Sequence, residues 1–112
     1  MRVAVTTPEA MGSCDAIVLS PRASFTNRAR TNVRMAGLIA NGALIVHLAR
    51  RLTGYTGVAV MVTNPVDVLA RVFSERSGCE RVVGIGAATD TARYRLTLAR
   101  HLRVPVGAVE GT

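Results

Sequence analysis

Residues 58–69 read Val-Ala-Val-Met-Val-Thr-Asn-Pro-Val-Asp-Val-Leu and combine a strand, a turn and a helix start in one stretch. The apolar run 58–62 predicts a strand covered on both faces. Pro65 disfavours the helical conformation at Asn64, so we expect the strand to end there and a helix to begin at Pro65, with Asn64 as its cap. Apolar residues then recur at the period of a helix, and Gly78 is expected to end it.

The same alternation of short apolar runs and helical patterns extends over the whole chain, and it predicts an α/β fold with a parallel sheet. The expected strands are residues 2–5, 15–19, 58–62, 82–85 and 106–109, and the expected helices are residues 27–52, 65–77 and 90–102. On the last helix the predicted inward residues are Ala92, Leu96 and Ala99. On the first long helix one face carries Val33, Ala36, Ala40, Leu44 and His47, and its apolar side is widened by Met35, Leu38, Ile45, Ala49 and Leu52.

The chain has 112 residues, 49% hydrophobic and 19% charged, which fits one small globular domain. Its longest apolar stretch, residues 36–49, is interrupted by Asn41 and His47 and is shorter than the roughly 20 residues of a membrane span. The first residues are too short for a secretory signal. Cys14 and Cys79 stand far apart, which predicts reduced thiols in a cytoplasmic protein and no metal site.

The chain is basic, with a net charge of +7. All 14 basic residues are arginine, they are scattered from Arg2 to Arg103, and only four residues are aromatic. Because no aromatic platform for stacking bases is visible, we interpret the charge as a solvated surface. We expect neither nucleic-acid nor membrane binding.

Ligands of parallel sheets bind beyond the carboxyl ends of the strands, which here are residues 20–26, 63–65 and 86–90. Asn64 lies at such an end and directly before a helix. Its amide either caps that helix or offers a donor and an acceptor to a ligand, and the residues alone support both interpretations equally.

A second candidate group lies at the start of the last helix. Thr89 suits the cap position and Asp90 the first turn. Arg93 fits poorly, because a cation near a helix N-terminus opposes the helix dipole and an ion pair with Asp90 offsets only about 0.2–0.5 kcal/mol. Arg93 is therefore a candidate to bind a carboxylate through two parallel hydrogen bonds.

Two other patterns are interpreted as structural. Gly84 and Gly86 follow a strand as in a dinucleotide-binding turn, but Thr89 occupies the third glycine position. His47 lies within a predicted helix and His101 near the end of another, and neither has a partner in a recognised nucleophile motif. We expect no catalytic role for either histidine.

Taken in order, residues 15–19, 32–33, 62–69, 82–86 and 90–95 resemble the L-lactate/malate dehydrogenase family. The resemblance extends over essentially the whole chain, and the motifs Val-Thr-Asn-Pro-Val-Asp and Asp-Thr-Ala-Arg carry it jointly. The second motif is closer to bacterial lactate dehydrogenases, which favours L-lactate over malate. The resemblance implies a partial Rossmann-like, doubly wound parallel sheet that lacks the first glycine-fingerprint βαβ unit.

The resemblance implies an oxidoreductase that uses NAD and a small 2-hydroxy or 2-oxo acid. Arg93 would bind the substrate carboxylate, and Asn64 its hydroxyl or carbonyl oxygen. Asp90 would orient a catalytic histidine that is missing from this chain and stabilise its protonated form. The implied cofactor contacts are Asn32, Val62, Thr63 and Asn64.

The resemblance starts after the glycine-rich turn of the family and stops before its histidine motif. It implies that residues 1–104 are part of a dinucleotide-binding domain and that residues 105–112 begin a truncated catalytic domain. One hypothesis is part of a dehydrogenase that transfers a hydride between substrate C2 and NAD, with the isolated chain inactive. The alternative is a non-catalytic remnant, or an interaction module that pairs with a full-length dehydrogenase subunit.

The implied strand order leaves residues 15–19 with a bare edge. A bare apolar edge is a template for pairing, so we expect a homo-oligomer formed through that edge, or residues 2–5 in the vacant place beside Ile17.

Overall fold

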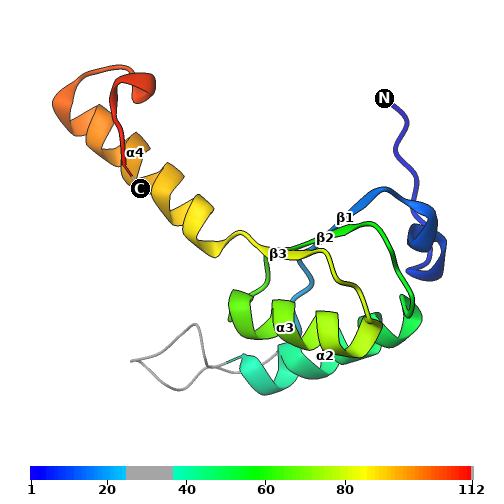
Figure 1. Ribbon diagram of the computed structural model, residues 1–112. Helices are drawn as coiled ribbons and strands as arrows, with labels where there is room; N and C mark the ends of the chain where they lie inside the picture. The colour runs from blue at the N-terminus through cyan, green and yellow to red at the C-terminus, as the bar shows by residue number, and fades with distance from the viewer. Residues whose placement is uncertain (25–36, 112) are drawn as a thin grey trace.

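The computed structural model describes residues 1–24 and 37–111 (Figure 1). Alternation of strands and longer helices confirms the predicted α/β class. The helices are α2 (Leu38–Arg51), α3 (Val66–Ser77) and α4 (Gly86–Leu102), and the short 3-10 helices are η1 (Glu9–Ser13) and η2 (Val106–Ala108). The strands are β1 (Ala16–Leu19), β2 (Val58–Met61) and β3 (Val82–Gly84). Among these described helices, none has the length and apolar character needed to span a membrane.

The strands form one parallel sheet in the order β1-β2-β3, so β1 lies at an edge of the described sheet, as predicted for residues 15–19. Met61 at the end of β2 is level with Leu19 of β1 and with Gly84 of β3. Because the strands run in the same direction, their carboxyl ends meet at one edge of the sheet. The chain leaves that edge from β2 into α3 and from β3 into α4.

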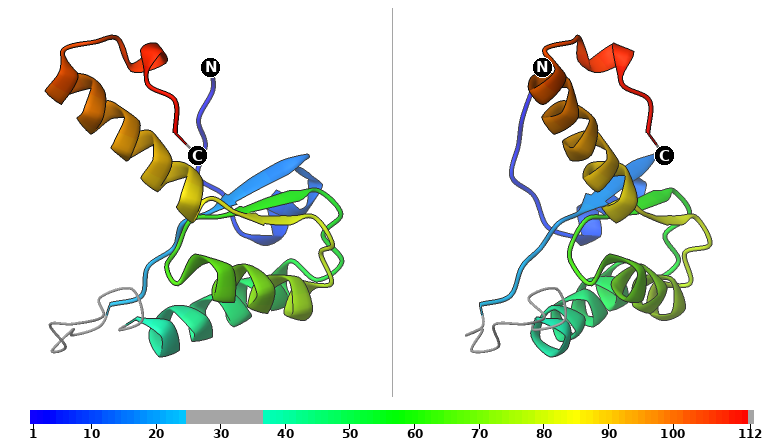
Figure 2. Two further views of the ribbon diagram at one scale, coloured as in Figure 1. Left: turned by 60° about the vertical axis from the view of Figure 1, so that its left-hand side comes forward. Right: turned by 90° about the vertical axis from the view of Figure 1, so that its left-hand side faces the viewer.

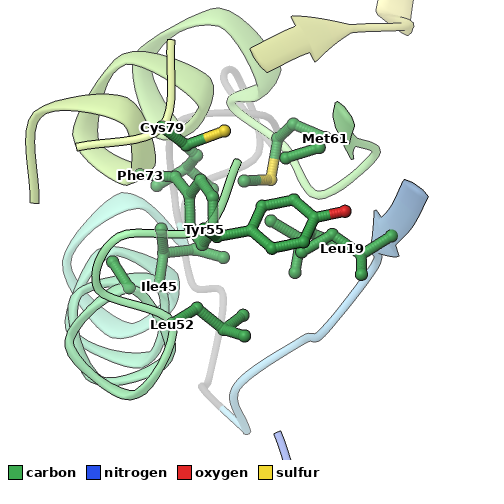
Figure 3. Packing of buried hydrophobic residues seen from close by; sticks show 11 residues of the cluster. Leu19, Ile45, Leu52, Tyr55, Met61, Phe73 and Cys79 are labelled. Atoms are coloured by element: carbon green, nitrogen blue, oxygen red, sulfur yellow. The ribbon is translucent and has the colours of Figure 1, made fainter. Parts of the chain in front are cut away.

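Helices α2 and α3 lie side by side against one face of the sheet (Figure 2). Alternate residues of β1 and β2 point into this interface, as the strand period requires. Figure 3 shows Phe73, Ile45 and Met61 packed together between the helices and the strands. The buried cluster comprises Ile17, Leu19, Ile45, Ala49, Leu52, Tyr55, Ala59, Met61, Leu69, Phe73 and Cys79.

The opposite face of the sheet carries no described helix (Figure 2). Val18 is 67% exposed and Val83 is 51% exposed, while Val58 and Val60 are half-buried. The prediction that residues 58–62 are covered on both faces is therefore wrong. The strand pattern at 82–85 likewise predicts a buried strand, and this too is wrong, because Val83 and Gly84 are exposed. A continuous apolar run is compatible with two covered faces, but the run itself cannot supply the second layer of helices.

The buried side of α2 matches the predicted apolar side in part, since Ile45 and Ala49 are buried as expected. Asn41, Ile45 and Ala49 are buried at intervals of four residues, whereas His47 is exposed. The prediction of His47 on the inward face is wrong, because the face that meets the sheet is turned away from it. Residues 27–36 of the predicted helix fall within the 25–36 segment, outside the described residues.

The end of α3 follows the prediction. Gly78 adopts the left-handed conformation, with a φ of 77°, and its N–H donates to the Ser74 carbonyl at 2.9 Å. Glycine carries no Cβ and takes this conformation without strain, which is why the helix ends there.

Helix α4 projects from the end of β3 away from α2 and α3 (Figures 1 and 2). Of its predicted inward residues only Ala99 is buried; Ala92 is exposed and Leu96 is 40% exposed, so that prediction is wrong for both. The chain turns back along α4 after Leu102, and the Arg95 guanidinium donates to the Val109 carbonyl at 2.7 Å. This arrangement raises the radius of gyration to 16.7 Å, against about 13 Å for a compact domain of this length.

Neither end of the chain forms a strand within residues 1–24 and 37–111. Residues 2–5 lie outside the sheet, with Val3 83% exposed, so both the predicted strand and its placement beside Ile17 are wrong. The predicted strand at 106–109 is instead the 3-10 helix η2 followed by the buried Val109. Near the N-terminus, η1 is held to the end of α2 by an ion pair between Glu9 and Arg51.

Candidate functional site

A cleft of about 410 Å³ opens beyond the carboxyl ends of β2 and β3, between the first turns of α3 and α4. Parallel sheets place ligands in this position, because helix N-termini and loop side chains converge there. The lining residues are Val62, Asn64, Val66, Asp67, Ile85, Gly86, Ala87, Thr89, Asp90 and Arg93. Four predicted site residues therefore share one cleft: Val62, Asn64, Asp90 and Arg93.

Asn64 lines the cleft without capping α3. The residue before the helix is Pro65, which is extended, and no side chain caps the first turn. The Asn64–Pro65 peptide bond is cis. Of the two interpretations of Asn64, the cap is wrong. Its exposed side chain borders the cleft, where an amide presents one donor group and one acceptor.

The two residues before Asn64 differ in orientation. Val62 is half-buried and lines the cleft. Thr63 is buried, and its hydroxyl donates to the Pro21 carbonyl at 2.6 Å in the segment that follows β1. The Thr63 side chain thus faces the neighbouring loop and does not line the cleft.

Asp90 and Arg93 lie on the second turn of α4, because the helix begins at Gly86 rather than at Asp90. The Thr89 hydroxyl donates to the Gly86 carbonyl at 2.8 Å inside the helix, so the prediction of Thr89 as cap and Asp90 in the first turn is wrong. A guanidinium nitrogen of Arg93 lies 3.8 Å from an Asp90 carboxylate oxygen, and the Arg93 side chain is 75% exposed. This exposed ion pair is too long for a strong hydrogen bond, so it holds the guanidinium only weakly.

Sequence reasoning assigned no role to Asp67, although it lines the same cleft from the first turn of α3. A Cβ on Gly84 would lie 3.1 Å from an Asp67 carboxylate oxygen, and a Cβ on Gly86 would lie 2.7 Å from a Val66 methyl carbon. The two glycines therefore let the start of α3 approach the end of β3 closely. Their spacing serves packing, in agreement with the structural interpretation of this turn.

The remaining predicted residues lie elsewhere. Asn32 falls outside the described residues. His47 is exposed on α2 and His101 is exposed at the far end of α4, and neither lines the cleft. The acid–base groups of the cleft are thus the carboxylates of Asp67 and Asp90.

Comparison with known proteins places this chain beside one group of enzymes, although no family model matches it. It is 39% identical over 75 residues to the L-lactate dehydrogenase of Treponema denticola, which covers 63% of this chain and 24% of the relative. It is 41% identical over 59 residues to the L-lactate dehydrogenase of Lactobacillus delbrueckii subsp. bulgaricus, covering 51% and 19%.

Solved structures agree with these relatives. A minor L-lactate dehydrogenase from Enterococcus mundtii superposes with a TM-score of 0.77 at 27% identity, over 96% of this chain and 34% of that one. In fold alone, the malate dehydrogenase of Cryptosporidium parvum matches with a TM-score of 0.81 at 24% identity, over 95% and 34%.

The chain spans about a quarter or less of the length of these curated relatives. Within that span the likeness holds both in sequence and in the arrangement of the sheet and helices. The predicted resemblance to the L-lactate/malate dehydrogenase family, with a partial Rossmann-like parallel sheet, is therefore confirmed.

Proposed function

We propose that this chain forms part of an NAD-dependent 2-hydroxy-acid dehydrogenase that transfers a hydride between substrate C2 and NAD, with L-lactate favoured over malate. The observation that carries the proposal is the convergence of two separate motifs, around Asn64 and around Asp90 and Arg93, on one cleft. The curated relatives to which the chain is similar are L-lactate dehydrogenases.

Each polar group of the cleft has a role that its chemistry suits. Arg93 is exposed and only weakly held by Asp90, so its guanidinium can bind a substrate carboxylate through two hydrogen bonds. Asn64 can donate to the substrate oxygen at C2. Asp90 has a carboxylate suited to orienting a histidine, and no histidine lines the cleft in the described part of the chain.

The residues at the cleft fit the nicotinamide end of NAD in part. Val62 offers an apolar surface and Asn64 an amide, which suit a flat ring that carries a carboxamide. Thr63 could contribute only backbone groups, because its hydroxyl is bound to Pro21. Asn32 stays a proposed contact on the strength of the family resemblance. NAD supplies the hydride chemistry. The residues of this chain would orient the nicotinamide and the substrate and exclude solvent from them.

We further propose the division of the chain at residues 104 and 105, between part of the dinucleotide-binding domain and the start of the catalytic domain. Support comes from the end of α4, where Arg103 adopts a left-handed conformation with a φ of 55° and the chain reverses direction.

The free thiols of Cys14 and Cys79 fit a reducing compartment, and on that ground we propose that the protein is located in the cytoplasm.

The open edge of β1 favours the second candidate function, in which the chain pairs with another subunit. Within the described residues β1 pairs only with β2, and Val18 beside its free edge is 67% exposed. We propose a second copy of this chain as the partner, because an apolar strand without a charged residue is a ready template for an identical strand.

Binding of oxamate, a 2-oxo acid analogue, tests the proposed site on the chain itself. In a nuclear magnetic resonance titration, oxamate should shift the Arg93 guanidinium and Asn64 side-chain signals. Arg93→Gln should weaken binding by about tenfold or more, because it removes charge-assisted hydrogen bonds.

Arg100→Gln, on the same helix but outside the cleft, is the matched control and should leave the affinity unchanged. Acetate at equal ionic strength controls for simple anion binding. Equal losses in both arginine variants, or equal shifts with acetate, would refute a specific substrate site.

A further inference from the structure

Asn41 is a buried amide in the middle of an apolar helix face. It is 5% exposed and lies on α2 between the sheet-facing positions, one turn before the fully buried Ile45. Burying an amide without hydrogen bonds costs about 1–3 kcal/mol in proteins. Its presence in the core therefore requires partners.

Both ends of the Asn41 side chain have partners in loops at the carboxyl edge of the sheet. Its Oδ1 accepts from the Ala23 N–H at 2.9 Å, and its Nδ2 donates to the Asn64 carbonyl at 3.1 Å. Ala23 belongs to the segment after β1, and Asn64 follows β2. A backbone N–H can only donate and a carbonyl can only accept, so the two contacts together define the orientation of the amide.

We propose that Asn41 is a positioning residue for the cleft, holding the Asn64 backbone in place and thereby directing the Asn64 side chain toward the ligand. This inference rests on the proposed function of the cleft. The Asn64 side chain itself is exposed, and in the described part of the chain the hydrogen bond from Asn41 to its carbonyl anchors this residue to the core. Asn41 therefore acts through the backbone of Asn64 and shapes the site without touching the substrate.

A second contact joins the same two loops. The Thr63 hydroxyl donates to the Pro21 carbonyl at 2.6 Å, next to the Asn41 bridge. The two contacts act in parallel, since each links the segment after β1 to the segment after β2. Loss of Asn41 alone should therefore loosen the Asn64 loop without unfolding the chain.

Ser77 provides a matched control at the other end of α3. It is 2% exposed, its hydroxyl donates to the Phe73 carbonyl at 2.7 Å, and it accepts from the Cys79 N–H at 3.1 Å. Ser77→Ala removes a buried polar group with two hydrogen bonds, as Asn41→Ala does. It lies outside the cleft and touches neither loop that Asn41 joins.

The experiment measures oxamate affinity and amide hydrogen exchange in the full chain and in three variants, Asn41→Ala, Asn41→Leu and Ser77→Ala. The leucine variant fills the space of the amide and keeps the chain folded if the alanine cavity does not. Both Asn41 variants should lose protection at the Ala23 N–H, shift the Asn64 signals and bind oxamate about 2- to 10-fold more weakly. Ser77→Ala should lower the melting temperature without changing the affinity.

Unchanged oxamate affinity in folded Asn41 variants that have lost Ala23 protection overturns the positioning role and leaves the proposed site intact. An affinity loss in Ser77→Ala equal to that of the Asn41 variants also overturns it, because general destabilisation would then explain both. If the unmodified chain gives no oxamate shifts, the proposed function fails. If the Ala23 N–H keeps its protection from hydrogen exchange in the Asn41 variants, Asn41 does not join the two loops, whether or not oxamate binds.

Discussion

Gly57 lies against the hydroxyl end of Tyr55, where a Cβ on residue 57 would come within 2.1 Å of the phenol oxygen. Tyr55 is 4% exposed, and its hydroxyl donates to the Cys14 carbonyl at 3.0 Å just before β1. Burial raises the pKa of this phenol above its ordinary value. The ring therefore closes the core at the end of the sheet opposite the cleft, and only glycine leaves it room.

Gly57→Ala should destabilise the chain by about 1–3 kcal/mol, the usual cost of overpacking a core. The new methyl group would also come within 2.6 Å of the Asp15 carbonyl, which belongs to the backbone and cannot swing away. The measurement is urea unfolding followed by circular dichroism.

Gly42→Ala is the control, because it should raise the stability of the chain where Gly57→Ala lowers it. Residue 42 lies inside α2, and a Cβ there would meet no atom within 4 Å. Alanine is favoured over glycine in a helix by about 0.5–1 kcal/mol, so this variant should gain stability. Equal effects of the two substitutions would contradict the close contact at Tyr55.

The attachment of η1 should depend on pH. The hydrogen bond from Arg51 lowers the pKa of Glu9 from 4.5 to about 2. A carboxylate with a lowered pKa stabilises the folded state above its unfolded value, and this contribution disappears as the pH falls toward the folded value. The contact between η1 and α2 should therefore weaken between pH 4.5 and about 2, as followed by the amide resonances of residues 9–13.

Glu9→Gln should abolish this transition and leave η1 loosely held at every pH. Glu75→Gln, which breaks an exposed pair with Arg71 on α3, should leave it unchanged. A transition that persists in Glu9→Gln would assign it to another group. Added salt should weaken the attachment, because the Glu9 and Arg51 side chains are both exposed to solvent.

The isolated chain should not oxidise L-lactate or malate above background when NAD is supplied. No histidine lines the cleft in the described part of the chain, and loss of a general base typically costs about 10²–10⁴-fold in rate. NADH absorbance measures the reaction. Turnover that is lost in His47→Asn or His101→Asn would show that one of these exposed side chains acts as the base.

Association through the free edge of β1 can be blocked at one backbone group. The Val58 N–H donates to the Asp15 carbonyl, and the Val62 N–H donates to the Leu19 carbonyl. Backbone groups of a strand alternate in direction, so the odd-numbered residues of β1 face β2 and the Val18 N–H points toward the free edge. Val18→Pro removes that donor without breaking the bonds to β2. Light scattering should show a dimer for the unmodified chain and a monomer for this variant.

Val18→Thr keeps the N–H and should still dimerise. A chain that stays monomeric at every concentration, or a proline variant that dimerises as before, would contradict pairing through β1.

The unit from β2 to α3 could be predicted closely from local rules. Pro65 restricts its neighbour and Gly78 adopts a left-handed conformation, so the bounds of α3 follow from two residues and an apolar period. The predicted start of α4, at residue 90, is four residues later than the observed start at Gly86. The prediction relied on Thr89, whose residue type is favoured at the cap position. The chain enters the helix directly from β3 at Gly86, where close approach to Val66 decides the backbone path.

Residues of the candidate site were predicted where a motif repeats a known pattern, as at Asn64 and Arg93. The bridge through Asn41 could not be predicted, because its partners lie 18 and 23 residues away and neither contact involves a motif. The sequence shows Asn41 only as a polar interruption of an apolar stretch. Its role depends on which loops the fold brings above α2.

The single layer of helices on the sheet also determines how the chain responds to heat and denaturant. Unfolding can expose only the apolar surface that folding has hidden, and here the second face of the sheet and most of α4 are already in contact with water. The heat capacity change and the denaturant m-value should therefore be small for a chain of 112 residues. Such a chain unfolds over a broad range of temperature and urea, and its stability varies little between cold and warm conditions.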